Sequence, residues 1–382
     1  MPFDSKPRPS LRDMARQLGM SHVAVSLALR DSPNISAKRR LEVKALAEKL
    51  GYQPDPMLTA LTAYRLAKRS TKVHSCIAWL NLWAAPEELR TYKEFDGYWR
   101  GAALAAEKLG YRLEEFCWSN EKPGGRLQTI LQTRGIRGIL LPPHKNGFHL
   151  SDFNWDLFSV VRFGASVVVP RVHAITSDQS FCGRLAYQKA HEKGYRRIGY
   201  ISSEVVHRNT SGHFREGYLN VQKEIALKPN HLEPLELDRE TPKKHPAQLK
   251  AWLARQRPDA VITTENYLRT TLASLGLRIP EDLAVAGLSM LDGNFDSGVD
   301  QNPVEIGRVA VSTLASLIVE NERGIPPYAR RILVEGKWHD GTSLPSKTTD
   351  APASDRKPRQ RSPRHAQVAA NSRKTPGAKK RR

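Results

Sequence analysis

One short stretch near the N-terminus carries side chains that could contact a nucleic acid. Ser21, His22, Ser26 and Arg30 are spaced so that one helix would expose all four. Hydroxyl, imidazole and guanidinium groups bond to phosphates and to base edges in the major groove. Further cationic side chains flank the stretch, namely Arg12, Arg16, Lys38, Arg39 and Arg40. The pattern favours DNA binding, although short helices joined by a Gly turn also occur in helical domains that bind no DNA.

A second group of residues could bind a sugar. Trp83, Tyr92, Phe95 and Trp99 are all aromatic and lie close together in the sequence. Aromatic rings of this kind are suited to stacking on the apolar face of a sugar ring. Packing inside a lobe or at a dimer contact would explain the same cluster equally well.

Motifs of common enzyme chemistry are absent from the sequence. There is no Gly-x-Gly-x-x-Gly after a predicted strand, no Walker loop, no His-Glu-x-x-His and no Gly-x-Ser-x-Gly. The 12 histidines show no metal-ligand spacing, and the 3 cysteines form no Cys-x-x-Cys pair. We therefore predict no cofactor, metal or disulfide framework. An enzyme on an α/β scaffold remains the alternative from another class, because fold alone does not give function.

Three helices must position the DNA-contacting residues. The first begins at Ser10, with Asp13 as the acid of its first turn, and ends at Gly19; Ser21 and Ser36 begin the second and the third. The apolar positions expected to face inward are Leu11, Met14, Ala15, Leu18, Val25, Leu29, Leu41, Ala45, Leu46, Ala47 and Leu50. Two short helices joined by a Gly turn and braced by a longer third helix predict a helix-turn-helix unit.

A fourth, shorter helix is predicted over residues 57–64. Asp55 would cap it and Pro56 would take its first position, while Leu58 and Leu61 fall on one side. Eight residues are too few to be helical alone, so this segment should fold only against something else, such as its symmetry mate and DNA.

The N-terminal residues resemble the signature of the LacI/GalR family of bacterial transcription regulators. The resemblance rests on residues 11–21 (Leu-Arg-Asp-Met-Ala-Arg-Gln-Leu-Gly-Met-Ser), 25–29 (Val-Ser-Leu-Ala-Leu), Ser36 and Gly51-Tyr52-x-Pro54. It implies that residues 21–30 form the recognition helix and that the side chain of Leu61 wedges into the minor groove. It also implies phosphate contacts from Ser21, Ser26, Ser36 and Tyr52. The DNA-binding residues expected are Ser10, Leu11, Ser21, His22, Val23, Ser26, Leu27, Arg30, Asn34, Ser36, Tyr52, Leu58 and Leu61.

Two positions of the recognition helix depart from the family pattern. The family usually carries Arg directly after the Val-Ser pair and Asn three residues further on, where this chain has Leu27 and Arg30. A guanine contact is therefore not expected at Leu27, whose apolar side chain favours a thymine methyl group.

The rest of the chain, residues 74–344, alternates short apolar runs with amphipathic stretches. The strands predicted are 76–80, 111–117, 138–141, 167–169, 198–201, 260–262 and 284–286, with helices over 98–109, 126–132, 183–192 and 270–275. Such alternation predicts an α/β core with mostly parallel sheets in two doubly wound lobes. Ligands of such folds bind at the carboxyl ends of strands or between lobes.

This part of the chain also resembles the family's core, which is akin to periplasmic sugar-binding proteins. The matching stretches are 97–111, 137–142, 193–200, 258–262 and 277–287. The resemblance implies an effector site whose polar positions match at Asp178 and Asn266, with Asn81 and Trp83 just past the first strand. The family's Arg is replaced by Phe214, beside Arg215, and the acid after Gly287 is replaced by Ser289. The effector-binding residues expected are Asn81, Trp83, Asp178, Phe214, Arg215, Asn266 and Ser289.

Charge is concentrated at the two ends of the chain. The total is +21, of which residues 1–72 carry +8 and residues 345–382 carry +10, while the residues between carry only +3. Basic ends of this kind favour polyanions. No apolar run is long enough to cross a membrane and no secretion signal precedes the head, so we expect a cytoplasmic, nucleoid-associated protein without a membrane partner.

Four segments and one function follow from these patterns. Residues 10–53 are expected to be the DNA-binding domain, 54–73 a hinge helix and linker, 74–344 the effector-binding and dimerisation core, and 345–382 a disordered basic tail. The expected function is a homodimeric repressor that binds a palindromic operator and responds to a small molecule, most plausibly a carbohydrate. The alternatives are a nucleoid-type protein that binds DNA without sequence preference, or a sugar-binding or enzymatic α/β protein with an incidental basic head.

Overall fold

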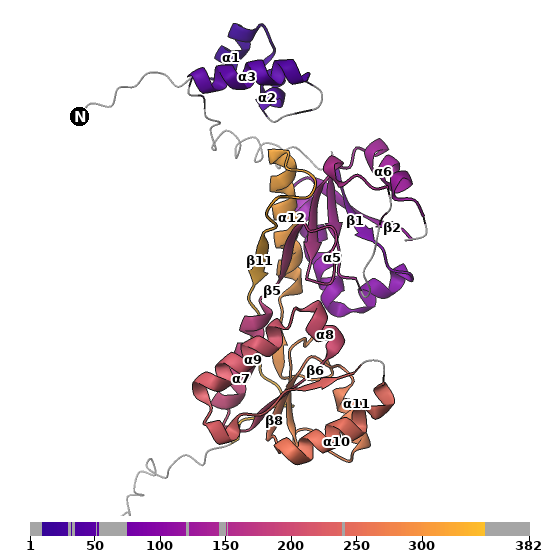
Figure 1. Cartoon of the computed structure of the whole chain (residues 1–382), viewed down its shortest axis with the longest axis vertical. Helices are drawn as coiled ribbons and strands as arrows, with labels where there is room; N and C mark the ends of the chain where they lie inside the picture. The colour runs from indigo at the N-terminus through magenta and orange to yellow at the C-terminus, as the bar shows by residue number, and fades with distance from the viewer. Residues whose placement is uncertain are drawn as a thin grey trace, which may run out of the picture. The chain divides into compact units, whose positions relative to one another are not determined.

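The structure is a computed structural model that describes residues 10–29, 32, 35–50, 52, 75–119, 122–144, 150, 152–238 and 241–347. These residues form a helical head, over 10–52, and a core of two lobes, over 75–347 (Figure 1). Several predictions fall on residues outside these ranges: the contacts of Arg30, Asn34, Leu58 and Leu61, the hinge helix, and the tail beyond Lys347.

The head contains the three expected helices, α1 (Leu11–Leu18), α2 (His22–Leu29) and α3 (Ala37–Leu50). Ser10 and Asp13 form a capping box at the start of α1: the Ser10 hydroxyl accepts from the Asp13 main-chain N–H, and the Asp13 carboxylate accepts from that of Ser10. The Ser10 hydroxyl also donates to the Asp13 carboxylate at 2.6 Å, and this bond, together with the one from the Ser10 main-chain N–H, lowers the pKa of Asp13. Gly19 ends α1 with φ 61°, a left-handed conformation that glycine adopts without strain.

A small apolar core joins the three helices of the head. Its fully buried members are Met14, Val25, Ala28 and Val43. The inward face predicted for α3 is wrong in part: Leu41 is 70% exposed, and Ala45 is exposed too. The helix faces inward through residues 43, 46, 47 and 50, a spacing that follows one side of a helix. Leu41 lies two residues before residue 43 and therefore on another side.

The first lobe of the core is built on a six-stranded sheet in the order β11-β5-β4-β3-β1-β2, in which neighbouring strands are parallel. Its strands are β1 (Ser75–Asn81), β2 (Tyr111–Cys117), β3 (Gly138–Leu141), β4 (Ser159–Phe163), β5 (His173–Ser177) and β11 (Arg331–Val334). Helices α5 (Lys93–Lys108) and α12 (Pro303–Glu320) pack on one face of this sheet and α6 (Gly124–Thr133) packs on the other. Short 3-10 turns, η1 (Pro86–Thr91) and η2 (Trp155–Leu157), lie in its loops.

The second lobe repeats this plan. Its sheet has the order β12-β10-β9-β8-β6-β7, with only β12 antiparallel to its neighbour. The strands are β6 (Ile198–Ser203), β7 (Leu235–Leu237), β8 (Ala260–Thr263), β9 (Ala284–Gly287), β10 (Gly298–Asp300) and β12 (Lys337–His339). The helices are α7 (Gln179–Glu192), α8 (Glu204–Asn209), α9 (His213–Ile225), α10 (His245–Gln256) and α11 (Leu268–Ser274), with 3-10 turns η3 (Lys228–Asn230) and η4 (Pro242–Lys244).

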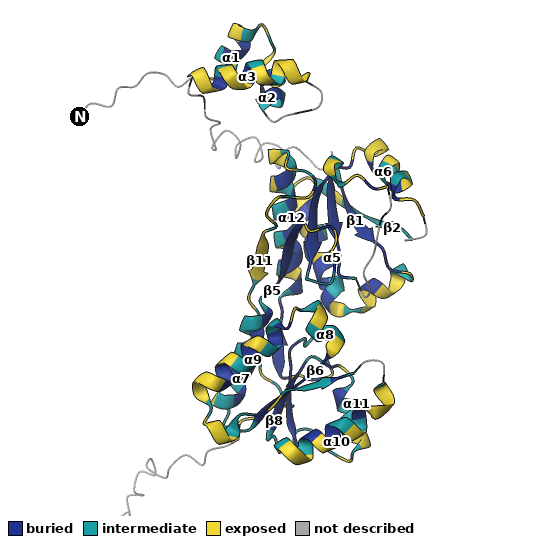
Figure 2. Ribbon diagram, in the orientation of Figure 1, coloured by how far each residue is buried: buried dark blue, intermediate teal, exposed yellow. Residues whose placement is uncertain are grey.

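The chain passes between the lobes three times, after β5, β10 and β11. Figure 2 shows the inner strands of both sheets in the colour of buried residues, the edge strand β11 mainly in the colour of exposed ones, and exposed residues along the outer sides of the helices. The two-lobed α/β fold expected from the alternating pattern is therefore present. No helix among the residues described here has both the length and the apolar character needed to span a membrane.

One predicted strand is wrong, and six strands were not predicted, namely β4, β5, β7, β10, β11 and β12. Residues 167–169 form an irregular loop in which Val168 and Val169 are 73% and 62% exposed. The strands on either side of this loop, β4 and β5, are fully buried, although they contain Arg162 and His173. Apolar residue type alone is therefore a poor guide here. The loop exposes its valines, whereas the buried strands contain polar side chains with partners: Arg162 donates to the Gly164 carbonyl, and the His173 ring accepts from the Arg330 main-chain N–H.

Close packing of α5 on α12 gives a first testable prediction. A Cβ atom added at Gly101 would lie 1.9 Å from the Val304 carbonyl oxygen, which belongs to the backbone of α12. Gly101→Ala should therefore force the two helices apart and lower the free energy of unfolding by about 3 kcal/mol. Gly125→Ala is the matched control, because its Cβ would lie 3.4 Å from the nearest atom, a carbonyl oxygen of Asp152. Urea unfolding measures both variants, and equal stability would contradict this packing.

Candidate ligand cavity and nucleic-acid interface

Of the described side chains that were expected to contact DNA, the head exposes five and leaves four half-buried. Ser10, Ser21, His22, Val23 and Ser36 are exposed. Leu11, Ser26, Leu27 and Tyr52 are half-buried. The exposed cations Arg12, Arg16, Lys38 and Arg39 belong to the same small domain. The head therefore combines hydrogen-bonding groups and positive charge, as a DNA-binding surface requires.

The hydroxyls of Ser21 and Ser36 also have a local structural role. Ser21 Oγ accepts from the Ala24 main-chain N–H at 3.1 Å, and Ser36 Oγ accepts from that of Arg39 at 3.4 Å. Each hydroxyl therefore caps the start of its helix. Because both side chains remain exposed, each hydroxyl can still donate its hydrogen to a phosphate oxygen.

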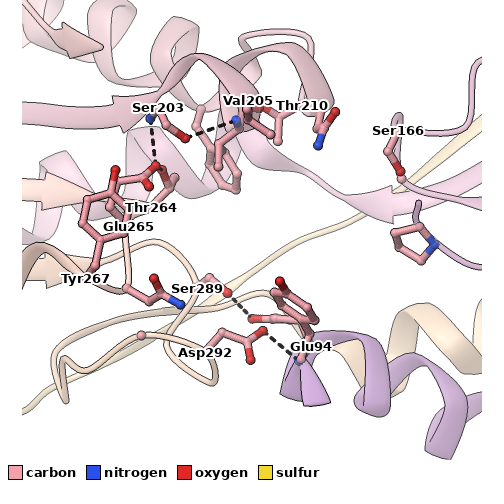
Figure 3. Close-up of a pocket in the computed structure, with 18 of the residues that line it drawn as sticks. Glu94, Ser166, Ser203, Val205, Thr210, Thr264, Glu265, Tyr267, Ser289 and Asp292 are labelled. Carbon is pink, nitrogen blue, oxygen red and sulfur yellow. Dashed lines mark hydrogen bonds between the residues drawn. The ribbon is translucent and has the colours of Figure 1, made fainter. Parts of the chain in front are cut away.

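A cavity of about 870 Å³ lies between the two lobes of the core. It opens at the carboxyl ends of the parallel strands: Trp83 follows β1, Gly164–Ser166 follow β4, Ser203 ends β6, Thr264–Tyr267 follow β8, and Ser289 follows β9. This is the position at which open α/β folds bind ligands. Figure 3 shows side chains of both lobes converging on the cavity.

Aromatic side chains form part of the cavity wall. Trp83, Tyr92 and Phe95 all line it, with ring centroids of Tyr92 and Phe95 lying 5.7 and 6.4 Å from that of Trp83. The indole N–H of Trp83 donates to the Pro143 carbonyl at 2.8 Å, which fixes the ring. Trp99, the fourth aromatic residue of the sequence cluster, packs instead against Trp79, with 5.4 Å between ring centroids.

Four of the seven effector-binding residues expected from the sequence lie in the cavity wall: Trp83, Phe214, Asn266 and Ser289. Phe214 is 3% exposed and takes the place of the Arg usual in the family, so this part of the wall is apolar. Ser289 takes the place of an acid, and its hydroxyl donates to Glu94 Oε1 at 2.9 Å.

The other three residues are not among those that line the cavity. Asn81 is buried, and its side chain bonds to the Pro86 carbonyl, to Glu115 and to the Trp83 main-chain N–H. It therefore helps to fix the main chain of Trp83. Asp178 caps α7 by accepting from the Phe181 N–H at 2.9 Å. Arg215 faces Glu236, with 3.3 Å between Nε and Oε1.

Carboxylates in the cavity wall were missed by the sequence analysis. Glu94, Glu265 and Asp292 line the cavity, and the first two are 5% and 6% exposed. Burial raises the pKa of Glu94 to about 8, and the nearby charges of Asp292 and Asp300 add to the rise, whereas the hydrogen bond from Ser289 opposes it. In the sequence, Glu94 lies within the aromatic cluster and Glu265 directly precedes Asn266. The sequence signal that could have identified both residues was therefore their position beside an expected site residue.

Hydrogen bonds link the lobes across the cavity. Asp292, in the second lobe, accepts from the main-chain N–H groups of Lys93 and Glu94 in the first turn of α5, at 2.6 and 3.1 Å. Gln301, another wall residue that the sequence analysis missed, accepts from the Ser177 hydroxyl at 2.5 Å. The cavity and the contacts that hold the lobes together therefore share residues.

Comparisons with known proteins match both parts of the chain. Residues 10–55 match the family described as bacterial regulatory proteins, lacI family, and residues 187–344 match a periplasmic binding protein-like domain. The transcriptional regulator GntR of Escherichia coli K12 is 24% identical over 344 residues, which cover 86% of this chain and 92% of GntR.

Solved structures share the fold. A complex of the transcriptional regulator CelR with cellobiose has a TM-score of 0.50 and 21% identity, covering 88% of this chain and 100% of CelR. A LacI-family regulator of Enterococcus faecium with bound ribose has a TM-score of 0.50 and 16% identity, covering 72% of this chain and 100% of that one. A LacI-family protein of Rhizobium etli has a TM-score of 0.52 and 17% identity, covering 71% of this chain and 99% of that one.

Proposed function

We propose that this chain, which belongs to the LacI family of bacterial DNA-binding transcription regulators, is a repressor. Its affinity for an operator responds to a small molecule that binds in the interlobe cavity. The observation that carries the proposal is the presence of a helix-turn-helix head and a two-lobed core with a cavity of about 870 Å³ in one chain. A DNA-binding head alone would need no such cavity. A ligand-binding core alone would need no such head.

The head supplies the DNA contacts in this proposal. Helix α2 enters the major groove with His22, Val23 and Leu27 at the bases, while Ser10, Leu11, Ser21, Ser26, Ser36 and Tyr52 contact the backbone. Arg30 and Asn34 complete this surface. The residue ranges follow the sequence prediction: 10–53 for the head, 54–73 for the hinge and linker, 74–344 for the core and 345–382 for the tail.

Two copies of the chain act together in this proposal. A homodimer places two heads in successive major grooves of a palindromic operator, with the paired hinge segments in the minor groove between them. Large apolar side chains exposed on the single chain support a subunit contact, such as Leu104 on α5 (65% exposed) and Leu333 on β11 (53% exposed).

A carbohydrate in the cavity is the proposed effector. The wall combines aromatic rings with hydrogen-bonding groups from both lobes, and two regulators of the same fold were solved with cellobiose and with ribose. A ligand held by both lobes favours one arrangement of the lobes, and the dimer then passes this preference to the hinge. The coupling free energy expected is about 1–3 kcal/mol.

The hinge part of the proposal predicts a selective loss of affinity in Leu61→Ala. Removal of the wedge should weaken binding to the operator about 10-fold or more, because the bend that the wedge permits is lost. Binding to random duplex should stay within a factor of two, since phosphate contacts supply most of it. Fluorescence anisotropy with both DNAs measures this, and equal losses on the two would remove Leu61 from the hinge role.

Selection of bound DNA from a random pool tests the proposed function. Full-length protein is incubated with the pool at near-physiological salt, and the retained DNA is sequenced. A palindrome with half-sites about one helical turn apart is the expected result. Retention of duplex without any sequence preference would favour a nucleoid-type protein instead.

A further inference from the structure

The cavity wall has a charge opposite to that of the whole protein. The chain carries a net charge of +21, yet the charged side chains that line the cavity, among the residues described, are Glu94, Glu265 and Asp292, with no Lys or Arg. The two histidines of the wall, His144 and His245, each direct Nε2 to a main-chain carbonyl, at 2.8 and 2.6 Å. An anion in this cavity would therefore meet carboxylates and would not meet a described guanidinium or ammonium group.

Glu94 lines this cavity from the first lobe. Its Oε1 accepts from the Ser289 hydroxyl at 2.9 Å, whereas Oε2 is fully buried and has no hydrogen-bond partner among the described residues. A buried polar atom without a partner costs free energy, so a positively charged group bound beside this carboxyl would be favourable. Figure 3 shows Glu94 and Ser289 together at the cavity.

Glu265 presents a second carboxylate from the opposite lobe. Its Oε1 accepts from the Ser203 main-chain N–H at 2.8 Å and from the Thr264 hydroxyl at 2.9 Å, which fixes the side chain at the end of β8. Asp292 adds a third carboxylate beside Glu94. A molecule lying between the lobes therefore meets carboxyl groups on both sides.

We propose that the cavity takes a polyhydroxylated compound without negative charge, either a neutral sugar or an amino sugar, and excludes sugar acids and sugar phosphates. This inference rests on the proposed function and adds the chemical class of the effector. Hydroxyl and ammonium groups donate to the carboxylates of Glu265 and Asp292, and these charges would repel a carboxylate or phosphate on the ligand in a poorly hydrated site. The aromatic rings of Trp83, Tyr92 and Phe95 supply the apolar surface against which such a compound can stack.

Proton release distinguishes the neutral from the amine-bearing ligand. With its pKa raised to about 8, the Glu94 carboxyl is mostly protonated at pH 7 in the empty cavity. An ammonium group beside it favours the ionised form, so an amino sugar should release close to one proton on binding. A neutral sugar should release almost none. Titration calorimetry at pH 7 in buffers with different ionisation enthalpies measures the number.

A thermal-unfolding panel tests the charge class. Full-length protein is mixed with neutral mono- and disaccharides, with amino sugars, and with the sugar acids and sugar phosphates of the same skeletons. The variant Ser166→Trp, which places an indole ring in the wall of the cavity to obstruct ligand binding, is run in parallel, so that anions bound to the basic parts of the chain are subtracted. We expect stabilisation of the wild type but not of Ser166→Trp by at least one neutral or amino sugar, and by none of the acids or phosphates.

Carboxylate variants then locate the contact. Glu265→Gln should weaken binding of the stabilising compound about 10-fold or more, and Glu94→Gln should do so for an amino sugar, whose ammonium group favours the ionised Glu94. Glu224→Gln is the control, because Glu224 pairs with Arg184 on the surface of the second lobe. The inference would be overturned if a sugar acid or sugar phosphate stabilised the protein through the cavity. It would also be overturned if no neutral or amino sugar stabilised the protein. The DNA selection experiment does not depend on the charge of the ligand. If it yields a palindrome while the ligand panel contradicts the charge inference, the proposed regulator function is still supported.

Discussion

Met14→Ala should abolish most DNA binding by the full-length protein while leaving the unfolding of the two-lobed core unchanged. Met14 is fully buried among Val25, Ala28 and Val43 in a head that spans only residues 10–52. Truncation of a buried Met costs about 2–5 kcal/mol, and a domain this small has little stability to lose. We therefore expect the head to be largely unfolded and its affinity for the selected DNA to fall about 100-fold.

Leu41→Ala is the matched control for this prediction. Leu41 belongs to the same head but is 70% exposed, so its truncation should change the stability of the head by less than about 0.5 kcal/mol. Circular dichroism of thermal unfolding and anisotropy with labelled DNA measure both variants. Equal losses of stability and of DNA affinity in the two variants would show that Met14 is not part of an apolar core that stabilises the head.

Asp292→Ala should weaken effector binding about 10- to 100-fold and leave DNA binding in the absence of effector intact. The Asp292 carboxylate accepts two N–H groups at the start of α5, where the helix dipole also favours a negative charge. Hydrogen bonds to charged groups contribute about 1.5–3 kcal/mol each, and these two join one lobe to the other beside the cavity. Loss of the contact should shift the lobes away from the arrangement that holds the ligand.

Two further variants separate the charge of Asp292 from its position. Asp292→Asn keeps one acceptor oxygen and should fall between the wild type and Asp292→Ala in affinity. Asp282→Ala is the control, because Asp282 pairs with the exposed Arg278 on the surface of the second lobe, 3.0 Å away. Calorimetric titration measures all three. Unchanged affinity in Asp292→Ala would exclude a role of the interlobe contact in ligand binding.

Local signals in the sequence predicted most of the fold. Helix ends could be recognised at Ser10 with Asp13, at Gly19 and at Ser36, because capping interactions join residues that are close in the sequence. The strands β2 and β3 were predicted at their observed bounds, since each is a short run of strand-forming residues between breaks. The strands β4 and β5 were not predicted, because Arg162 and His173 interrupt the apolar pattern, and the partner of the buried His173 ring, Arg330, lies 157 positions away.

The cavity wall was less accessible to sequence reasoning. Trp83, Phe214, Asn266 and Ser289 could be placed because they follow strands or align with family positions. A single Glu in a sequence has the composition of a surface residue, and Glu94 becomes a cavity residue only when folding brings Ser289 to it from 195 positions away. Asn81 and Asp178 failed to reach the wall because nearby main-chain groups engage their side chains.

Reciprocal linkage between DNA and ligand tests the central claim most directly. The affinity of the full-length protein for its selected DNA site is measured without and with a saturating amount of the sugar that stabilises the core, and the sugar affinity is measured without and with the DNA. We predict that both affinities change by the same factor, between about 5- and 150-fold. A sugar that fills the cavity and leaves DNA affinity unchanged would contradict a ligand-responsive regulator.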